Sequence, residues 1–226
     1  MMYRVSVHYV RVIRPENRRQ VSPRTYASDT RQASSQATRR RIVLGALDLV
    51  KAEGGLRDFT MELVAKRSGV SRMTVYYQFH SRAELIDALF DELVERGHLV
   101  DGIARASEET DALMVVDRLV DAFCALWSCE PVAMRRLRSL ASVDPSLEAD
   151  LQARDDRRRV AVRMAVDRVT AAGEGGAARA SESIEALNAL LSFELWDILG
   201  GREGRVEEAC ARVHALVNAT IRIPSA

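Results

Sequence analysis

From residue 37 to the end of the chain, apolar residues recur at the spacing of about 3.6 residues that marks one face of an α-helix. The same stretch shows neither the alternation typical of strands nor an internal repeat. A chain with only this pattern buries its apolar residues by packing helix against helix. The sequence therefore predicts an all-α fold, and 226 residues allow one or two domains with a substantial core.

Composition and uncharged runs exclude several classes of protein. Apolar residues make up 47% and charged residues 29% of the chain, which is typical of a folded globular protein. A membrane-spanning helix needs about 20 apolar residues. The longest uncharged runs here, 73–81 and 213–221, have nine residues each. The first residues carry arginines where a signal peptide would be apolar, and three cysteines do not form a disulfide framework. We expect a cytoplasmic protein with reduced thiols.

Charge is sorted along the chain although the net charge is only +1. Residues 1–36 carry seven arginines and two acids, for +5, and residues 37–90 carry a further +3. The remaining residues, 91–226, sum to −7. A basic beginning joined to an acidic body is typical of a nucleic-acid-binding end attached to a domain with another role.

Residues 1–36 form a segment without a helical apolar stripe, and we expect a flexible basic arm. Its first residues alternate as a half-buried strand would, with Tyr3, Val5, Val7 and Tyr9 separated by polar residues. No other segment offers this strand a partner. Three interpretations stay open: a disordered arm, a strand that pairs between chains, and a reading frame that starts too early.

Four helices are predicted in residues 37–85, and each has a chemical reason for its start or its end. The first helix has a stripe from Ile42 to Val50 and ends at Gly54-Gly55. Thr60 caps a short second helix that stops at Gly69, and Ser71 caps a third helix that runs to Phe79. A capping box, Ser81 with Glu84 three residues later, opens the fourth.

Residues 86–226 are predicted to be a helical ligand-binding and dimerisation domain. Pro131 and Pro145 stand where a first helical turn tolerates proline, and residues 173–176 form a linker. From Ser183 to Leu199 apolar residues occupy nearly every side of one predicted helix. A helix of this kind is buried all round, against the core and a second subunit. We therefore expect a homodimer formed through the last two helices.

The second and third helices form a helix-turn-helix motif, in which the second helix of the pair enters the major groove of DNA. On that helix Val75 and Phe79 share the buried side. The other side and its flanks carry the side chains suited to a duplex: Arg72, Met73, Thr74, Tyr76, Tyr77 and His80. Arginine can grip guanine, threonine and methionine can touch a thymine methyl, and tyrosine can hold phosphate.

The run from Phe59 to Leu85 closely resembles the DNA-binding domain of the TetR family of transcriptional regulators. The resemblance is strong over residues 38–90, and beyond them only helix content, length and the two closing helices agree. It implies DNA contacts at Thr60, Arg72, Met73, Thr74, Tyr76, Tyr77 and Arg82, to which the exposed face adds His80 and the helix start adds Ser71. Position 82 is usually lysine in the family and position 73 is usually small, so Met73 changes the expected base preference. Residues 1–36 are longer than the usual arm.

The resemblance implies a transcriptional repressor that binds a palindromic operator of double-stranded DNA as a dimer and is released by a small-molecule effector. The soft and aromatic side chains named below favour a hydrophobic effector. Two alternatives stay open: a constitutive regulator that needs no ligand, and a small enzyme. No catalytic motif is present, so we expect no enzyme. The histidines and cysteines show no metal-ligand spacing, so we expect neither a metal nor a cofactor.

Soft and aromatic side chains of the second domain are candidates for the effector pocket. They are Phe123, Cys124, Trp127, Met134, Leu137, Met164 and Trp196. The alternative is a filled core with no cavity. The arginine clusters at 135–138 and 157–159 fit solvated helix faces better than an acidic-ligand site.

Overall fold

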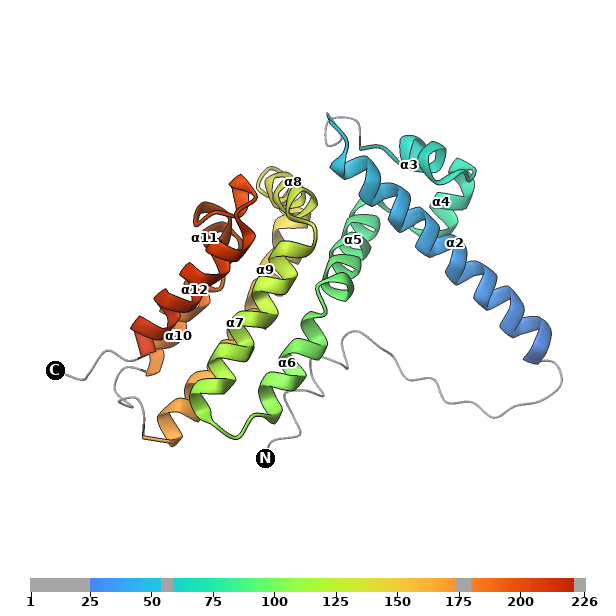
Figure 1. The fold of residues 1–226 in the computed structure, drawn as a ribbon. Helices are drawn as coiled ribbons and strands as arrows, with labels where there is room; N and C mark the ends of the chain where they lie inside the picture. Colours follow the sequence, from blue (N-terminus) through green and yellow to red (C-terminus); the bar gives the residue numbers. More distant parts are fainter. Residues whose placement is uncertain (1–24, 54–58, 174–179, 222–226) are drawn as a thin grey trace. The chain divides into compact units, whose positions relative to one another are not determined.

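The computed structural model describes residues 25–53, 59–173 and 180–221, and every element in these ranges is a helix (Figure 1). The all-α prediction is confirmed. No helix in these ranges has the length and apolarity needed to cross a bilayer. The elements, in chain order, are α2 (Thr25–Lys51), α3 (Met61–Ser68), α4 (Arg72–Gln78), α5 (Arg82–Arg96), α6 (Leu99–Glu108), α7 (Ala112–Cys129), α8 (Pro131–Ala141), α9 (Pro145–Ala171), α10 (Ala180–Leu190), α11 (Phe193–Ile198), the 3-10 helix η2 (Gly201–Glu203) and α12 (Val206–Ile221).

The described residues form two compact units. We call the first the HTH unit; it contains the described residues up to Glu92 together with Val132–Asp150. The C-terminal unit contains Leu93–Pro131 and the described residues from Leu151 onward. The boundary that the sequence suggested, after residue 85, lies inside α5. Helix α8 follows the predicted boundary in sequence but belongs to the HTH unit.

The first helix begins earlier than its apolar stripe does. Helix α2 starts at Thr25, so residues 25–36, which were expected to belong to the flexible arm, are helical. The prediction was wrong here because it required an apolar face, whereas most described side chains of this stretch are exposed. Residues 1–24, including the alternating start, lie outside the described residues, as does the expected end at Gly54-Gly55.

The core of the HTH unit forms where α2 packs on α3. Ile42, Ala46 and Val50 of α2 are completely buried. Gly45 brings the two helices close: a Cβ at this position would lie 2.3 Å from the Ser68 Oγ atom and 3.2 Å from the Ser68 Cα atom. The glycine is therefore required by the close approach of two backbones, rather than by an unusual φ angle.

Helix α8 is joined to α2 by an arginine. Arg136 donates hydrogen bonds to the backbone carbonyls of Val50 (2.6 Å) and Ala52. These carbonyls lie at the C-terminal end of α2, where they have no partner within the helix and where a cation is favoured by the helix dipole. The interpretation of residues 135–138 as a purely solvated face was therefore wrong for Arg136.

In the C-terminal unit, two glycines allow close packing against α7. Gly97 lies just before α6, and Gly102 lies within it. A Cβ at Gly97 would lie 2.6 Å from the Leu126 Cα atom, and one at Gly102 would lie 2.6 Å from the Ala122 Cβ atom. Helix α7 therefore buries Ala122 and Leu126 on the side that faces α6, in addition to Phe123 and Trp127. Helices α8 and α9 begin at Pro131 and Pro145, which confirms both predicted starts.

The predicted continuous helix from Ser183 to Leu199 is wrong. Helix α10 ends at Leu190, and the hydroxyl of Ser192 caps a new helix, α11, by accepting from the Leu195 N–H at 3.3 Å. Apolar residues seem to occupy every side of a single helix because the pattern spans two helices whose axes differ across this break. Each shorter helix buries one face and exposes another, so that Ile198 is 69% exposed.

Two arginines of α9 make contacts with other helices, and one of them, Arg158, belongs to the cluster 157–159 that was expected to be a solvated face. Arg158 is buried and donates to the carboxylate of Asp155 (2.7 Å) and to the side-chain carbonyl of Asn188 on α10 (3.1 Å). Arg168 donates to the carbonyls of Ser107 (2.9 Å) and Glu109 at the end of α6. Both contacts tie α9 to other helices of the C-terminal unit.

Candidate nucleic-acid interface

The turn between α3 and α4 is built from local chemistry. The Thr60 hydroxyl accepts from the Leu63 N–H (3.2 Å) and opens α3. Gly69 ends this helix in the left-handed region, with φ 63° and ψ 37°, a conformation that glycine adopts at little cost. The Ser71 hydroxyl then accepts from the Thr74 N–H (3.0 Å) and opens α4. The three predicted caps of this motif are confirmed.

Helix α4 has one buried and one exposed face. Val75 and Phe79 have no exposed surface and anchor the helix to the HTH unit, as the spacing predicted. On the opposite face Met73 is 76% and Tyr77 80% exposed. Arg72, Tyr76 and His80 are also exposed, whereas Thr74 is half-buried. Met73 and Tyr77 lie four residues apart on one side of α4, so this face is available for contact with a partner.

Arg72 and Tyr76 form a pair on the flank of α4. The Arg72 guanidinium lies over the Tyr76 ring, with its Cζ atom 5.4 Å from the ring centre. A hydrogen bond between the two side chains raises the pKa of Arg72 above its ordinary value. The guanidinium keeps its charge and lies on the exposed flank of α4, where it is available for planar contact with a base or a phosphate.

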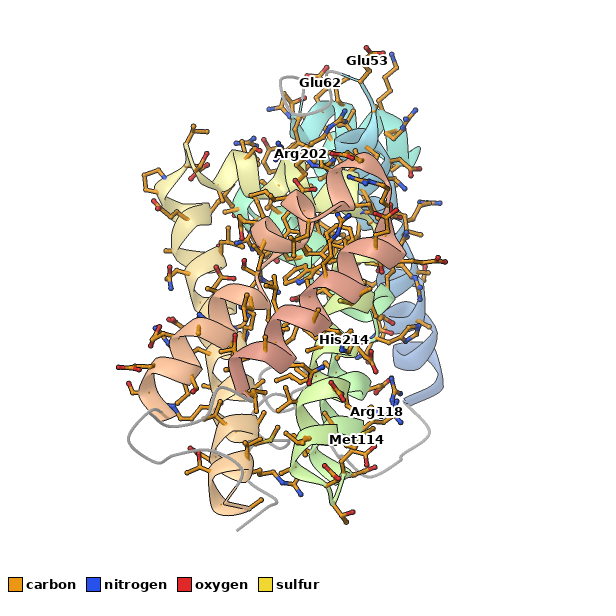
Figure 2. The ribbon with its side chains drawn as sticks, turned by 60° about the vertical axis from the view of Figure 1, so that its left-hand side comes forward. Glu53, Glu62, Met114, Arg118, Arg202 and His214 are labelled. Atoms are coloured by element: carbon orange, nitrogen blue, oxygen red, sulfur yellow. The ribbon has the colours of Figure 1, made fainter. Side chains whose placement is uncertain are left out.

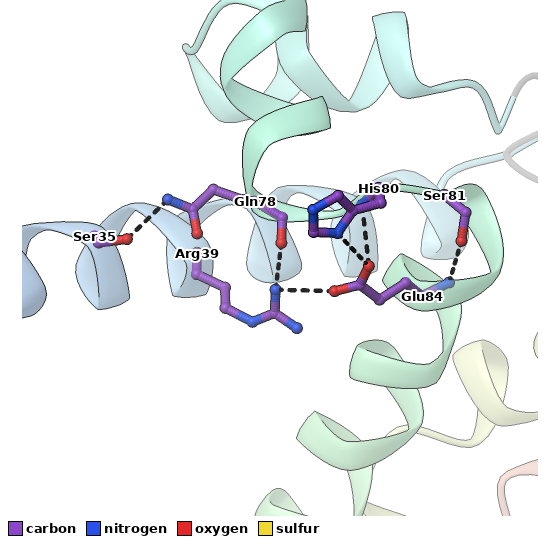
Figure 3. Close-up of polar contacts among 6 residues, drawn as sticks. All are labelled: Ser35, Arg39, Gln78, His80, Ser81 and Glu84. Carbon is purple, nitrogen blue, oxygen red and sulfur yellow. Dashed lines mark hydrogen bonds and ion pairs between the residues drawn. The ribbon is translucent and has the colours of Figure 1, made fainter.

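The C-terminal end of α4 is locked to α2 by contacts that the sequence did not reveal (Figure 3). Arg39 of α2 donates to the backbone carbonyl of Gln78, and its Cζ atom lies 3.9 Å from the centre of the Phe79 ring. The Gln78 side-chain amide donates to the Ser35 hydroxyl at 3.0 Å. Arg39 and Gln78 are therefore positioning residues for α4, and no signal could mark them because they are 39 positions apart.

A second network joins the end of α4 to the start of α5. The Ser81 hydroxyl accepts from the Glu84 N–H (3.0 Å), as the capping box predicted, but the Glu84 carboxylate accepts from the backbone N–H of His80 (3.0 Å). The Glu84 carboxylate also lies 3.1 Å from His80 Nδ1 and 3.6 Å from Arg39 Nη1. Burial opposes ionisation, yet the hydrogen bonds from His80 and the charge of Arg39 lower the pKa of Glu84. His80 is thereby held beside the exposed face of α4.

Arg82 is engaged within the HTH unit. Its Nη1 atom lies 3.8 Å from the Asp144 carboxylate, and its Cζ atom lies 5.6 Å from the centre of the Phe59 ring. The side chain is 38% exposed. A DNA phosphate at this position would have to share the guanidinium with Asp144, which weakens the contact expected of Arg82 relative to that of Arg72.

The candidate pocket residues are divided between the two units. In the C-terminal unit, the rings of Phe123, Trp127, Phe193 and Trp196 form a chain with centre-to-centre distances of 5.9, 5.6 and 5.9 Å. All four are buried, as is Cys124, and Met164 is half-buried. Met134 and Leu137 are buried in the HTH unit instead. Phe193 was missing from the predicted set, although it links the two tryptophans.

Helices α3 and α4 are short and are joined at Gly69, which has a left-handed conformation. One face of α4 is anchored in the HTH unit and the opposite face is exposed. This arrangement defines a helix-turn-helix module of the DNA-binding class. Residues 46–89 match the family model described as bacterial regulatory proteins, tetR family. The resemblance of the N-terminal module to the DNA-binding domain of the TetR family is therefore confirmed.

Curated relatives agree over the same part of the chain. A probable HTH-type transcriptional regulator of Pseudomonas putida, ArpR, is 38% identical over 79 residues, which are 35% of this chain and 36% of that protein. The HTH-type transcriptional regulator TtgR, also of Pseudomonas putida, is 38% identical over 77 residues, which are 34% of this chain and 35% of TtgR. The chain thus spans about a third of the length of these curated relatives.

Solved structures extend the likeness in fold. A TetR transcription regulator from Haloarcula marismortui has a TM-score of 0.68 at 19% identity, over 82% of this chain and 97% of that one. A TetR-family regulator from Rhodococcus sp. has a TM-score of 0.64 at 20% identity, over 82% and 99% of the two chains. The helical architecture beyond the HTH unit is therefore also one that regulators of this family adopt.

Proposed function

We propose that this chain is a transcriptional repressor that binds a palindromic DNA operator as a homodimer and releases it when a small hydrophobic effector binds. The observation that carries the DNA-binding part is the exposed face of α4, which presents Arg72, Met73 and Tyr77 while Val75 and Phe79 anchor the helix. The family match over residues 46–89 supports it. Retardation of the DNA that flanks the protein's own gene tests the proposal, and failure to retard any such fragment would contradict it.

Arg72 is the residue that we expect to read a base. Arg72→Ala should weaken binding to the operator about tenfold, or about 1.4 kcal/mol, because a bidentate contact to guanine is lost. Binding to random DNA should change little. The comparison is a titration on both DNAs at one salt concentration, with Arg163→Ala, which removes an exposed arginine of the C-terminal unit, as the control. Equal losses on operator and random DNA would mean that Arg72 contacts phosphate only.

A palindromic operator requires two recognition helices about 34 Å apart, and hence a two-fold dimer. The exposed face of α12 supports pairing through the last helices, because it carries small residues at Ala211, Ala215 and Ala219 beside the partly exposed Leu216. We expect sedimentation to give twice the mass of the 25.2 kDa chain. Leu216→Glu should yield monomers, whereas Val143→Glu, at an exposed apolar position in the HTH unit, should leave the dimer intact. If Leu216→Glu remained a dimer, the interface would have to lie on a surface other than this face of α12.

The effector proposal rests on the chain of aromatic rings in the C-terminal unit, since such rings line sites for apolar or aromatic molecules. A true effector should quench or enhance tryptophan fluorescence, raise the melting temperature and weaken operator binding about 5- to 150-fold, the usual range of allosteric coupling. The alternative is a constitutive regulator, in which these rings fill the core and leave no cavity for a ligand. A screen whose binders stabilise the protein without changing its affinity for DNA would support that alternative.

A further inference from the structure

Two cysteines meet where α12 packs on α7, at one end of a row of polar contacts. Three α12 residues spaced four apart, Cys210, His214 and Asn218, face Cys124, Asp121 and Asp117 of α7 in the opposite order. His214 Nε2 lies 3.0 Å from the Asp121 carboxylate, and the Asn218 amide donates to Asp117 at 3.4 Å (His214 is labelled in Figure 2). The row fixes the register of the two helices and thereby places the two sulfur atoms against each other.

The two thiols have different surroundings. Cys210 accepts a hydrogen bond from the Trp196 indole N–H at 3.4 Å and is hydrogen-bonded to the Cys124 thiol. Cys210 is half-buried, so small molecules in solvent can reach it, whereas Cys124 is 6% exposed. Both bonds to Cys210 are of the kind that stabilises a sulfur carrying negative charge, because each places a donor hydrogen on it.

The electrostatics of the pair follow from these contacts. The hydrogen bond from Cys124 lowers the pKa of Cys210, and the Trp196 N–H and the nearby His214 add to this, whereas burial and Asp121 oppose it. The pKa of Cys124 is raised by its hydrogen bond to Cys210 and by burial. Cys210 is therefore the more acidic thiol of the pair, and Cys124 is the one that keeps its proton more firmly. A partly exposed thiolate beside a second thiol is the arrangement found in oxidisable cysteine pairs.

We propose that Cys210 is a peroxide-reactive cysteine and that Cys124 is its resolving partner, so that oxidation joins α12 to α7 through a disulfide. The Cys210 thiolate attacks one oxygen of hydrogen peroxide; a sulfur–oxygen bond forms, the oxygen–oxygen bond breaks, and hydroxide leaves and is protonated to water. Cys210 is oxidised to the sulfenic acid and the peroxide is reduced. The Cys124 sulfur then attacks the Cys210 sulfur; the sulfur–sulfur bond forms and the hydroxyl group leaves with the Cys124 proton as water.

The third cysteine is an internal control. Cys129 lies on α7 five residues from Cys124, and its thiol donates to the backbone carbonyl of Leu126 at 3.1 Å. Burial and the neighbouring Glu130 raise the pKa of Cys129 to about 11. Cys129 therefore remains a protonated thiol under conditions in which Cys210 is ionised, and it reacts slowly with peroxide and with alkylating reagents.

The test uses the reduced full-length protein treated with hydrogen peroxide and analysed by peptide mass spectrometry. We expect a disulfide-linked pair of peptides that contain Cys124 and Cys210. Cys210→Ser should abolish the linkage, and Cys129→Ser should leave it unchanged. Cys124→Ser should leave a sulfenic acid at Cys210 that dimedone captures. Linkage through Cys129, or no oxidation of Cys210 by peroxide, would overturn the proposal.

Alkylation rates test the activation of Cys210 separately, without peroxide or DNA. With iodoacetamide at pH 7, Cys210 should react about 100-fold faster than Cys129, and its rate should reach a plateau at a lower pH. Trp196→Phe removes the N–H that donates to the Cys210 sulfur and should slow Cys210 severalfold. Equal alkylation rates for Cys210 and Cys129 in the wild-type chain would overturn the proposal, even if an excess of peroxide produced a disulfide.

Discussion

Replacement of Phe79 by alanine is expected to destabilise the HTH unit by about 3 to 5 kcal/mol and to abolish retention of operator DNA. Phe79 has no exposed surface, and its ring contacts the Arg39 guanidinium beneath the end of α4. Truncation leaves a cavity under the recognition helix and removes the anchor that sets its direction. Urea unfolding of the full chain, followed by circular dichroism, measures the loss of stability.

Tyr77→Ala is the matched control, because Tyr77 lies on the same helix and is 80% exposed. This variant should unfold within about 0.5 kcal/mol of the wild type, as surface substitutions do. Its affinity for DNA should nevertheless fall about tenfold, because a hydroxyl that can donate to a phosphate is lost. The assignment of the two faces of α4 would be wrong if Tyr77→Ala destabilised the protein as much as Phe79→Ala.

Arg39→Ala is expected to have the second largest effect, about 2 to 3 kcal/mol on the stability of the HTH unit, with weaker binding to every DNA sequence. The variant loses a charged hydrogen bond to the Gln78 carbonyl and the contact with the Phe79 ring (Figure 3). The half-exposed ion pair with Glu84 adds little, because water screens it. The measurement is again urea unfolding, paired with titrations on operator and random DNA.

Two further variants separate the role of Arg39 from that of charge alone. Arg40→Ala removes the neighbouring exposed arginine of α2 and should leave stability nearly unchanged. Arg39→Lys keeps the charge but loses the planar guanidinium, and should recover only part of the stability. If Arg39→Lys recovered the full stability, Arg39 would act through its charge alone. If Arg40→Ala lost as much stability as Arg39→Ala, the contacts of Arg39 with Gln78 and Phe79 would not explain the effect.

Several arginines of the described residues bind carbonyl groups at the C-terminal ends of other helices. Arg39, Arg136, Arg168 and Arg212 each donate to carbonyls at or just beyond the C-terminal end of another helix, namely α4, α2, α6 and α11. Such carbonyls have no partner within their own helix, and a guanidinium satisfies them while opposing the negative end of the helix dipole. Exposed arginine clusters and these capping arginines look alike in sequence, because the carbonyl that each one reaches belongs to another helix.

Local spacing along the chain was enough to predict the class of fold, the helix-turn-helix and the buried side of α4. Thr60, Gly69, Ser71 and Pro145 act on backbone groups within a few residues, so their chemistry can be read along the chain. Val75 and Phe79 were assigned to the core for the same reason, since four residues span about one helical turn.

The contacts between helices could not be predicted from local spacing and became visible in the folded chain. It placed Arg39 on the Gln78 carbonyl, 39 positions away, and brought Cys210 of α12 to Cys124 of α7. It also broke the apolar run after Leu190, where the Ser192 cap competes with continuation of the helix. Residues distant in sequence meet through the packing of whole helix faces, and that packing depends on all the side chains together. Local spacing therefore predicts which face is buried, but not which residue of another helix lies against it.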